Sequence, residues 1–174
     1  MDKKIIVKAS SGLGDQMFMY AHAYALAKKL KYKLFIDDRS AYFQSKNRTY
    51  YRSFALDCFN LTSPIASNND KYDNFYKHNV KKILKLFDKF KNKKNFLQEH
   101  QDIKKKTYYK EYNLNFTDHL YVEGGFRSEK YFANHRNALL NEFIIKNKLI
   151  KEDNKYIKIL KDTNSVSIHV RRNR

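Results

Sequence analysis

Two pairs of glycines stand where a backbone could approach a ligand closely. The 174-residue chain has four glycines, and the pairs Gly12/Gly14 and Gly124/Gly125 each directly follow a predicted strand. Glycine tolerates positive φ angles and adds no side chain. A strand, a glycine turn and a helix present backbone N–H groups and the helix dipole to a phosphate. The spacing indicates either an anion-binding turn or a tight turn with a purely structural role.

A basic pair follows a third predicted strand. Arg171 and Arg172 come directly after residues 165–170, a predicted strand that contains His169. Ligands of open α/β sheets bind at the carboxyl ends of the strands. The basic pair therefore stands at a ligand-binding edge, whereas His169 alone is at least as well explained as a core histidine.

The first glycine turn departs from the common nucleotide-binding fingerprints. Met17 stands where G-x-G-x-x-G requires its third glycine, and the Gly-Lys-Ser/Thr of a P-loop is missing. Asp37 and Asp38 do follow the second predicted strand, as a ribose-binding acid would. A dinucleotide-binding domain therefore stays open as an alternative.

The elements around these residues predict an α/β domain. Residues 4–9 and 33–37 are predicted to be short buried strands, and residues 16–30 keep helical spacing with many alanines. Asp15 is expected to cap that helix. This order is a βαβ unit, which predicts a parallel sheet. Further predicted elements are strands at 120–123 and 165–170 and helices at 128–143 and 153–161.

The best amphipathic pattern lies in the middle of the chain. Val80, Ile83, Leu84, Phe87 and Phe90 recur at helical spacing among the eight lysines of residues 77–94. One interpretation is a helix whose apolar side packs on the domain and whose lysines face solvent. The other is a basic helix that lies on an anionic membrane surface.

The composition bounds the class of protein. The net charge is +18, but Lys outnumbers Arg 28 to 8 along the whole chain, which favours a compositional bias, so no nucleic-acid partner is expected. Hydrophobic residues make up 42%, enough for a core. The single Cys58 excludes an internal disulfide framework and a Cys-rich zinc site. Without a secretory leader or a run of about 20 apolar residues, a cytoplasmic protein is expected, with peripheral attachment to the inner face of the cell membrane as a variant.

Four segments, in this order along the chain, resemble α-1,2-fucosyltransferases of glycosyltransferase family 11. Residues 11–21 (SGLGDQMFMYA) resemble the family's N-terminal motif GGLGNQMFQYA, and residues 51–59 resemble a looser segment. Residues 124–132 (GGFRSEKYF) resemble GYFQSEKYF, and residues 166–172 (VSIHVRR) resemble the strand and start of HxRRGD. The ordered set is far more specific than any one segment.

The resemblance implies a GT-B-like enzyme with two Rossmann-type domains and an active site between them. Such enzymes transfer fucose from GDP-fucose to the 2-hydroxyl of a terminal galactose on a glycan, with inversion. It implies donor-binding roles for His169, Arg171 and Arg172, because a planar guanidinium suits a leaving pyrophosphate. No cofactor is expected, and the absence of an Asp-x-Asp motif fits metal-independent transfer. The loop positions carried over are Gly12, Gly14, Gln16, Gly124, Ser128 and Glu129.

The departures from the family pattern matter for the site. Asp15 replaces the family's Asn and is the candidate for the catalytic base, which the sequence otherwise leaves unknown. Gly125 and Arg127 replace Tyr and Gln, and Asn173-Arg174 replace Gly-Asp.

The resemblance also predicts the domain organisation. It covers about the first half of a typical family member, with residues 1–160 as the acceptor-side α/β domain and 161–174 as the start of the GDP-fucose-binding domain. We expect a truncated form that does not catalyse transfer unaided. The alternative is a basic module that binds membranes or nucleic acid without catalysis.

Overall fold

The computed structural model describes residues 3–43, 52–99, 109–146, 155–166 and 168. The chain divides into two compact units, residues 1–144 and 145–174. The candidate donor residues His169, Arg171 and Arg172 lie outside the described residues, so their placement stays a prediction.

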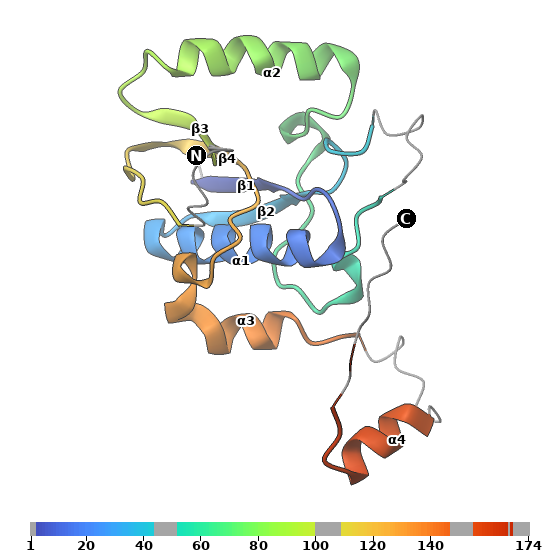
Figure 1. Ribbon diagram of the computed structural model, residues 1–174. Helices are drawn as coiled ribbons and strands as arrows, with labels where there is room; N and C mark the ends of the chain where they lie inside the picture. Colours follow the sequence, from blue (N-terminus) through green and yellow to red (C-terminus); the bar gives the residue numbers. More distant parts are fainter. Residues whose placement is uncertain (1–2, 44–51, 100–108, 147–154, 167, 169–174) are drawn as a thin grey trace. The chain divides into compact units, whose positions relative to one another are not determined.

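A four-stranded parallel sheet forms the centre of the first unit (Figure 1). Its strands are β1 (Lys4–Lys8), β2 (Lys33–Asp37), β3 (Lys94–Gln98) and β4 (Phe116–Glu123), in the order β2-β1-β4-β3. Ile5 of β1 pairs in register with Leu34 of β2 and Leu120 of β4. The predicted α/β class and βαβ unit are therefore confirmed, whereas β3 was not predicted.

Helix α1 (Leu13–Leu30) packs on one face of this sheet. Its buried alanines let the helix approach the sheet closely, and Ile5 and Val7 face it in the main apolar core. The expectation that Asp15 caps this helix is wrong. Gly12 is the N-cap residue, and Asp15 lies within the first turn, where the helix dipole favours an acid.

Helix α2 (Phe75–Asp88) lies on the opposite side of the sheet from α1 (Figure 1). The strand pleat turns Ile6 and Tyr121 toward this second face, where Tyr72 and Phe96 pack on them. Figure 1 shows α2 as the green helix that runs above the sheet.

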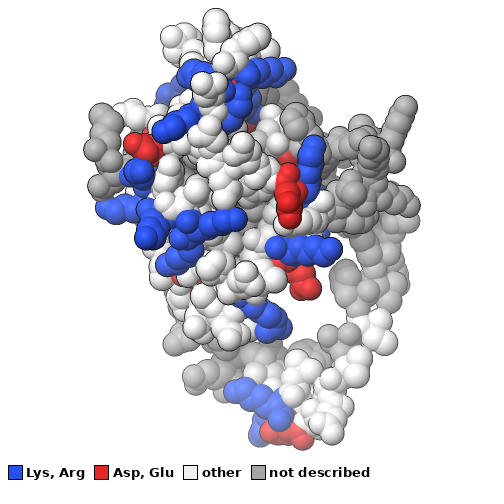
Figure 2. Space-filling view, turned by 90° about the vertical axis from the view of Figure 1, so that its left-hand side faces the viewer, with Lys and Arg blue, Asp and Glu red and all other residues white. Residues whose placement is uncertain are grey.

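The interpretation that α2 packs its apolar side on the domain is wrong. Its buried residues are Lys81 and Asp88, whereas Ile83, Phe87 and the following Phe90 are exposed. In Figure 2, α2 lies at the top of the molecule, where white side chains project beyond blue lysines. The helix also ends at Asp88, and Lys94 already belongs to β3.

The single helix expected over residues 128–143 is broken into three pieces. Two 3-10 turns, η4 (Glu129–Tyr131) and η5 (Ala133–His135), precede α3 (Arg136–Glu142). The break falls at Phe132, whose φ of −140° is not helical. Glu142 of α3 accepts a hydrogen bond from the buried Tyr20 hydroxyl of α1 at 2.7 Å, which fixes α3 to the core.

The second unit contains helix α4 (Lys155–Asp162), as expected from residues 153–161. Of the strand expected at 165–170, the described residues 165, 166 and 168 are in no strand. Within the described ranges, no helix is long and apolar enough to cross a membrane.

Candidate functional site

The carboxyl ends of β1, β2 and β4 meet at one edge of the sheet because the three strands are parallel neighbours. The turn after β1 contains Gly12, whose position as N-cap opens the first N–H groups of α1 at this edge. Gly14 lies in the first turn of α1, and a Cβ added there would meet nothing within 4 Å. Space is thus open beside Gly14, at the positive end of the helix.

Gln16 joins the glycine turn to residues 52–59. Its buried amide donates from Nε2 to the carbonyls of Ser11 at 3.1 Å and Ser53 at 3.0 Å, and its Oε1 accepts from the Ala55 N–H at 3.0 Å. The Arg52 guanidinium lies against Gly12, since a Cβ on that glycine would overlap it. Two of the segments quoted above are therefore held together by one glutamine.

Arg127 joins the glycine turn to the turn after β4. Its Nε donates to Asp15 Oδ1 at 2.8 Å. Ser128 accepts a hydrogen bond from the Lys130 N–H and caps η4, and Glu129 is exposed. Three of the four segments that carry the resemblance thus converge at one edge, and Asp15 and Arg127, both departures from the family pattern, are partners.

Gly124 is required by the backbone. It has a φ of +151°, and a Cβ on it would overlap Glu99 Cβ and lie 2.9 Å from Phe126 Cε2. A Cβ on Gly125 would make ordinary contacts, at 3.4 Å from Arg127. The two adjacent glycines therefore have different roles.

Asp37 is not available as a ribose-binding acid. It is fully buried, and its oxygens accept hydrogen bonds from the backbone N–H groups of Arg39 and Ser40, the Ser40 hydroxyl and the Tyr121 hydroxyl. Burial and the neighbouring Asp37 carboxylate raise the pKa of Tyr121, so that hydroxyl keeps its proton. Asp38 pairs with Lys71 at 2.6 Å. The carboxylates therefore stabilise the turn after β2, which removes the main support for the dinucleotide alternative.

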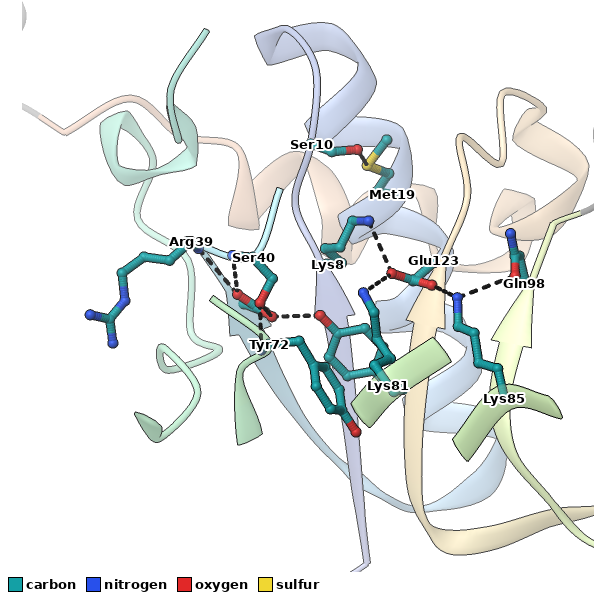
Figure 3. A network of polar contacts seen from close by, with 12 residues as sticks. Lys8, Ser10, Met19, Arg39, Ser40, Tyr72, Lys81, Lys85, Gln98 and Glu123 are labelled. Carbon is teal, nitrogen blue, oxygen red and sulfur yellow. Dashed lines mark hydrogen bonds and ion pairs between the residues drawn. The ribbon is translucent and has the colours of Figure 1, made fainter. Parts of the chain in front are cut away.

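A buried cluster of charges at the end of β4 was missed by the sequence analysis (Figure 3). Glu123 Oε1 accepts from Lys8 at 2.9 Å and from Lys81 at 2.8 Å, and its Oε2 pairs with Lys85. Burial opposes ionisation of Glu123, but the three ammonium groups outweigh it and lower the pKa to about 2. No local pattern signals the cluster, because its members lie on β1, α2 and β4.

A hollow of about 360 Å³ opens beside the end of β2. Its lining combines aromatic rings with charged and polar groups: Asp38, Arg39, Tyr42, Phe43, Ser53, Phe54 and Asp73. Burial raises the pKa of Tyr42 to about 12. The volume of this hollow falls within the range of small-molecule sites.

A larger hollow, of about 650 Å³, lies elsewhere, against residues 25–29 in the last turns of α1. Its lining includes no residue of the glycine turns, although it includes Lys130, Tyr131 and Phe132 from the end of the segment 124–132. We place the candidate site at the carboxyl edge, where three motif segments converge, and not in this hollow. Among the described side chains, no group of three His, Cys, Asp or Glu is placed to hold a metal ion, and metal independence stays a prediction.

Two curated proteins of Escherichia coli are similar to this chain over nearly its whole length. Alpha-1,2-colitosyltransferase is 29% identical over 97% of the chain, and the O-antigen biosynthesis glycosyltransferase WbnK is 31% identical over 94%. The alignments cover 54% and 57% of those proteins, so the chain spans about half the length of the curated relatives it matches. No protein-family model and no solved structure matches the chain. The chain is thus related in sequence to bacterial glycosyltransferases, and the similarity supports a glycosyltransferase family.

Proposed function

We propose that this chain forms the acceptor-side domain of a glycosyltransferase that builds a bacterial surface glycan. The observation that carries the proposal is the convergence of three motif segments at the carboxyl edge of the sheet, through Gln16 and the Asp15–Arg127 pair. This is the edge at which α/β domains bind ligands. The two glycosyltransferase relatives support the same class of reaction.

The donor that we propose is GDP-fucose, with a GDP-linked colitose as the nearest competitor, because one relative is named for a colitosyl group. The acceptor oxygen attacks the anomeric carbon, the bond from that carbon to the phosphate oxygen breaks, and GDP leaves with the electron pair. Arg171 and Arg172 would stabilise the charge that develops on the pyrophosphate. No metal ion is required in this scheme.

The acceptor that we propose is a terminal galactose, which attacks through its 2-hydroxyl. The hollow beside β2 suits a sugar, because Arg39 and Asp73, which pair with each other at 3.4 Å, can also hydrogen-bond hydroxyl groups and the aromatic rings can cover an apolar sugar face. Asp15, at the neighbouring glycine turn, is the candidate to receive the hydroxyl proton.

Donor binding tests one half of the proposal. Calorimetry measures GDP binding by the full chain and by its variant Arg171→Ala/Arg172→Ala. The matched control is Arg136→Ala, which changes an exposed arginine of α3. We expect the double variant to bind GDP at least tenfold more weakly than the parent and the control to bind it equally well. Because no metal ion is required in the proposed scheme, a chelator should change neither result. Equal binding by the double variant and its parent would show that the donor assignment is wrong.

Acceptor binding tests the other half. Saturation-transfer NMR with a β-galactoside is expected to give a signal that weakens in Asp73→Asn, because Asp73 lines the hollow. Asp118→Asn, an exposed carboxylate paired with Lys3, is the control. Calorimetry with GDP-fucose and with GDP-colitose in place of GDP then identifies the preferred donor. The absence of binding to any galactoside contradicts the acceptor assignment.

A further inference from the structure

Helix α2 presents an apolar surface to solvent. We call it the α2 crest: Tyr76, Ile83, Leu86 and Phe87 of the helix, with Phe90 two residues past its end. Their exposed fractions are 77%, 53%, 58%, 64% and 88%. Contiguous exposed apolar surface of this kind marks an interaction site in soluble domains.

The orientation of α2 is fixed by the opposite side of the helix. Lys81 is buried against Glu123 and lies over the rings of Tyr72 and Tyr121, at 5.2 and 5.4 Å from their centroids. Lys85, one turn further, pairs with the same Glu123.

The last turn of α2 is fixed in the same way. The Asp88 carboxylate accepts hydrogen bonds from the N–H groups of Asn95 at 2.9 Å and Phe96 at 3.1 Å. If the helix rolled to bury the α2 crest, these groups would separate and the buried Glu123 would lose two of its three ammonium partners, Lys81 and Lys85, which is costly. The crest therefore faces outward because the inward side is held by polar contacts.

The charges around the crest are of one sign. Lys82, Lys89, Lys91 and Lys93 are exposed beside it, and Asp88, the only acid between residues 75 and 94, is buried. Figure 2 shows white side chains at the top of the molecule, where α2 lies, with blue side chains beside and below them. Apolar side chains bordered by lysines match the interface of a bilayer that contains anionic lipids.

Two other occupants fit less well. A second copy would bring two lysine-rich surfaces together, and like charges repel at an interface. A nucleic acid would use the lysines but would leave the aliphatic side chains of Ile83 and Leu86 without an apolar partner. An anionic bilayer uses both features of the surface.

We infer that the α2 crest docks this protein onto an anionic lipid bilayer, with its aromatic and aliphatic side chains in the headgroup region and the flanking lysines on lipid phosphates. The inference does not depend on the proposed transfer reaction, since it rests on α2 alone. It would hold an acceptor-side domain at the membrane surface.

The absence of tryptophan from the sequence allows a specific reporter. Phe87→Trp places the only tryptophan on the crest, and Leu140→Trp, at a 53% exposed position of α3, is the matched control. Vesicles of phosphatidylcholine with phosphatidylglycerol are expected to shift the Phe87→Trp emission to the blue and leave the control unchanged. Affinity is expected to fall about tenfold or more with phosphatidylcholine alone or in high salt.

Paired variants separate the contribution of the apolar side chains to vesicle binding from that of the lysines. Phe87→Ser/Phe90→Ser should lose vesicle flotation, and Leu140→Ser, the apolar control, should retain it. Lys89→Gln/Lys93→Gln should weaken flotation several-fold more than Lys29→Gln/Lys110→Gln. A blue shift of the Phe87→Trp emission that appears without lipid as the protein concentration rises would mean self-association. A blue shift produced by RNA would mean that the crest binds nucleic acid. Equal flotation by the crest and control variants would mean that another surface docks on the vesicles. Each of these three results overturns the inference.

Discussion

Arg127 Nε donates to Asp15 Oδ1 at 2.8 Å, and this bond joins the turn after β1 to the turn after β4. The two side chains come from segments that lie 112 positions apart in the sequence. They are also two of the positions at which the chain departs from the fucosyltransferase pattern, where Asn and Gln stand. The Asp15–Arg127 pair therefore joins two motif segments, and an Asn–Gln pair at the same positions could join them through a hydrogen bond between amides.

The first prediction concerns this pair. Asp15→Ala and Arg127→Ala should each lower the free energy of unfolding by no more than about 1 kcal/mol, because both side chains reach solvent. Asp15→Asn/Arg127→Gln should restore most of the loss, since an amide pair can keep the hydrogen bond. Urea unfolding of the single and double variants measures the coupling, and strictly additive losses would show that the two side chains do not interact in solution.

The second prediction concerns Gly14. A Cβ at this position meets nothing within 4 Å, and alanine favours a helix more than glycine does. Gly14→Ala should therefore raise the free energy of unfolding by up to about 1 kcal/mol. If the space beside Gly14 holds a ligand, the same variant should bind donor or acceptor at least tenfold more weakly. Calorimetry beside thermal unfolding checks both, and full ligand affinity would show that the space is not used.

The third prediction separates the adjacent glycines after β4. Gly124→Ala should destabilise the fold by about 2 kcal/mol or more, because the φ of +151° is strained for alanine and its Cβ overlaps Glu99. Gly125→Ala is the matched control and should cost less than about 1 kcal/mol, since its Cβ makes only ordinary contacts. Chemical denaturation compares them, and equal losses would contradict the assigned backbone roles.

The sequence predicted what depends on local pattern. Two short continuous apolar runs, at residues 5–7 and 34–36, stand on either side of an alanine-rich segment with helical spacing. Together they predicted β1, α1, β2 and their parallel pairing. The glycine positions predicted the turns at the carboxyl edge. These features are local, so one sequence is enough to find them.

The orientation of α2 could not be predicted from the same kind of pattern. Its apolar residues recur at helical spacing, which normally marks a buried side, but Lys81 and Lys85 have a buried partner in Glu123 on β4. Glu123 is 42 positions from Lys81 and carries no local signal. Pairing of buried charges between distant elements therefore decided which side of α2 faces the sheet.

The last prediction is the acid sensitivity of that pairing. The pKa of Glu123 in the folded protein is about 2, below the value of about 4.3 for an unperturbed glutamate, so the unfolded chain binds the proton more tightly. The contribution of the ionised carboxylate is complete above about pH 4.5 and is lost as the pH falls toward 2, and the shift corresponds to about 3 kcal/mol. Glu123→Gln removes this titration and leaves Lys81 buried without a charged partner, so it should be less stable at pH 7 and lose less stability than the parent between pH 5 and pH 3. Urea unfolding at pH 7, 5 and 3 measures how the free energy of unfolding of the parent and of the variant depends on pH.

The same dependence on pH in parent and variant would mean that Glu123 does not control the acid response. Asp118→Asn, which changes an exposed carboxylate on the same strand, serves as the control and should follow the parent.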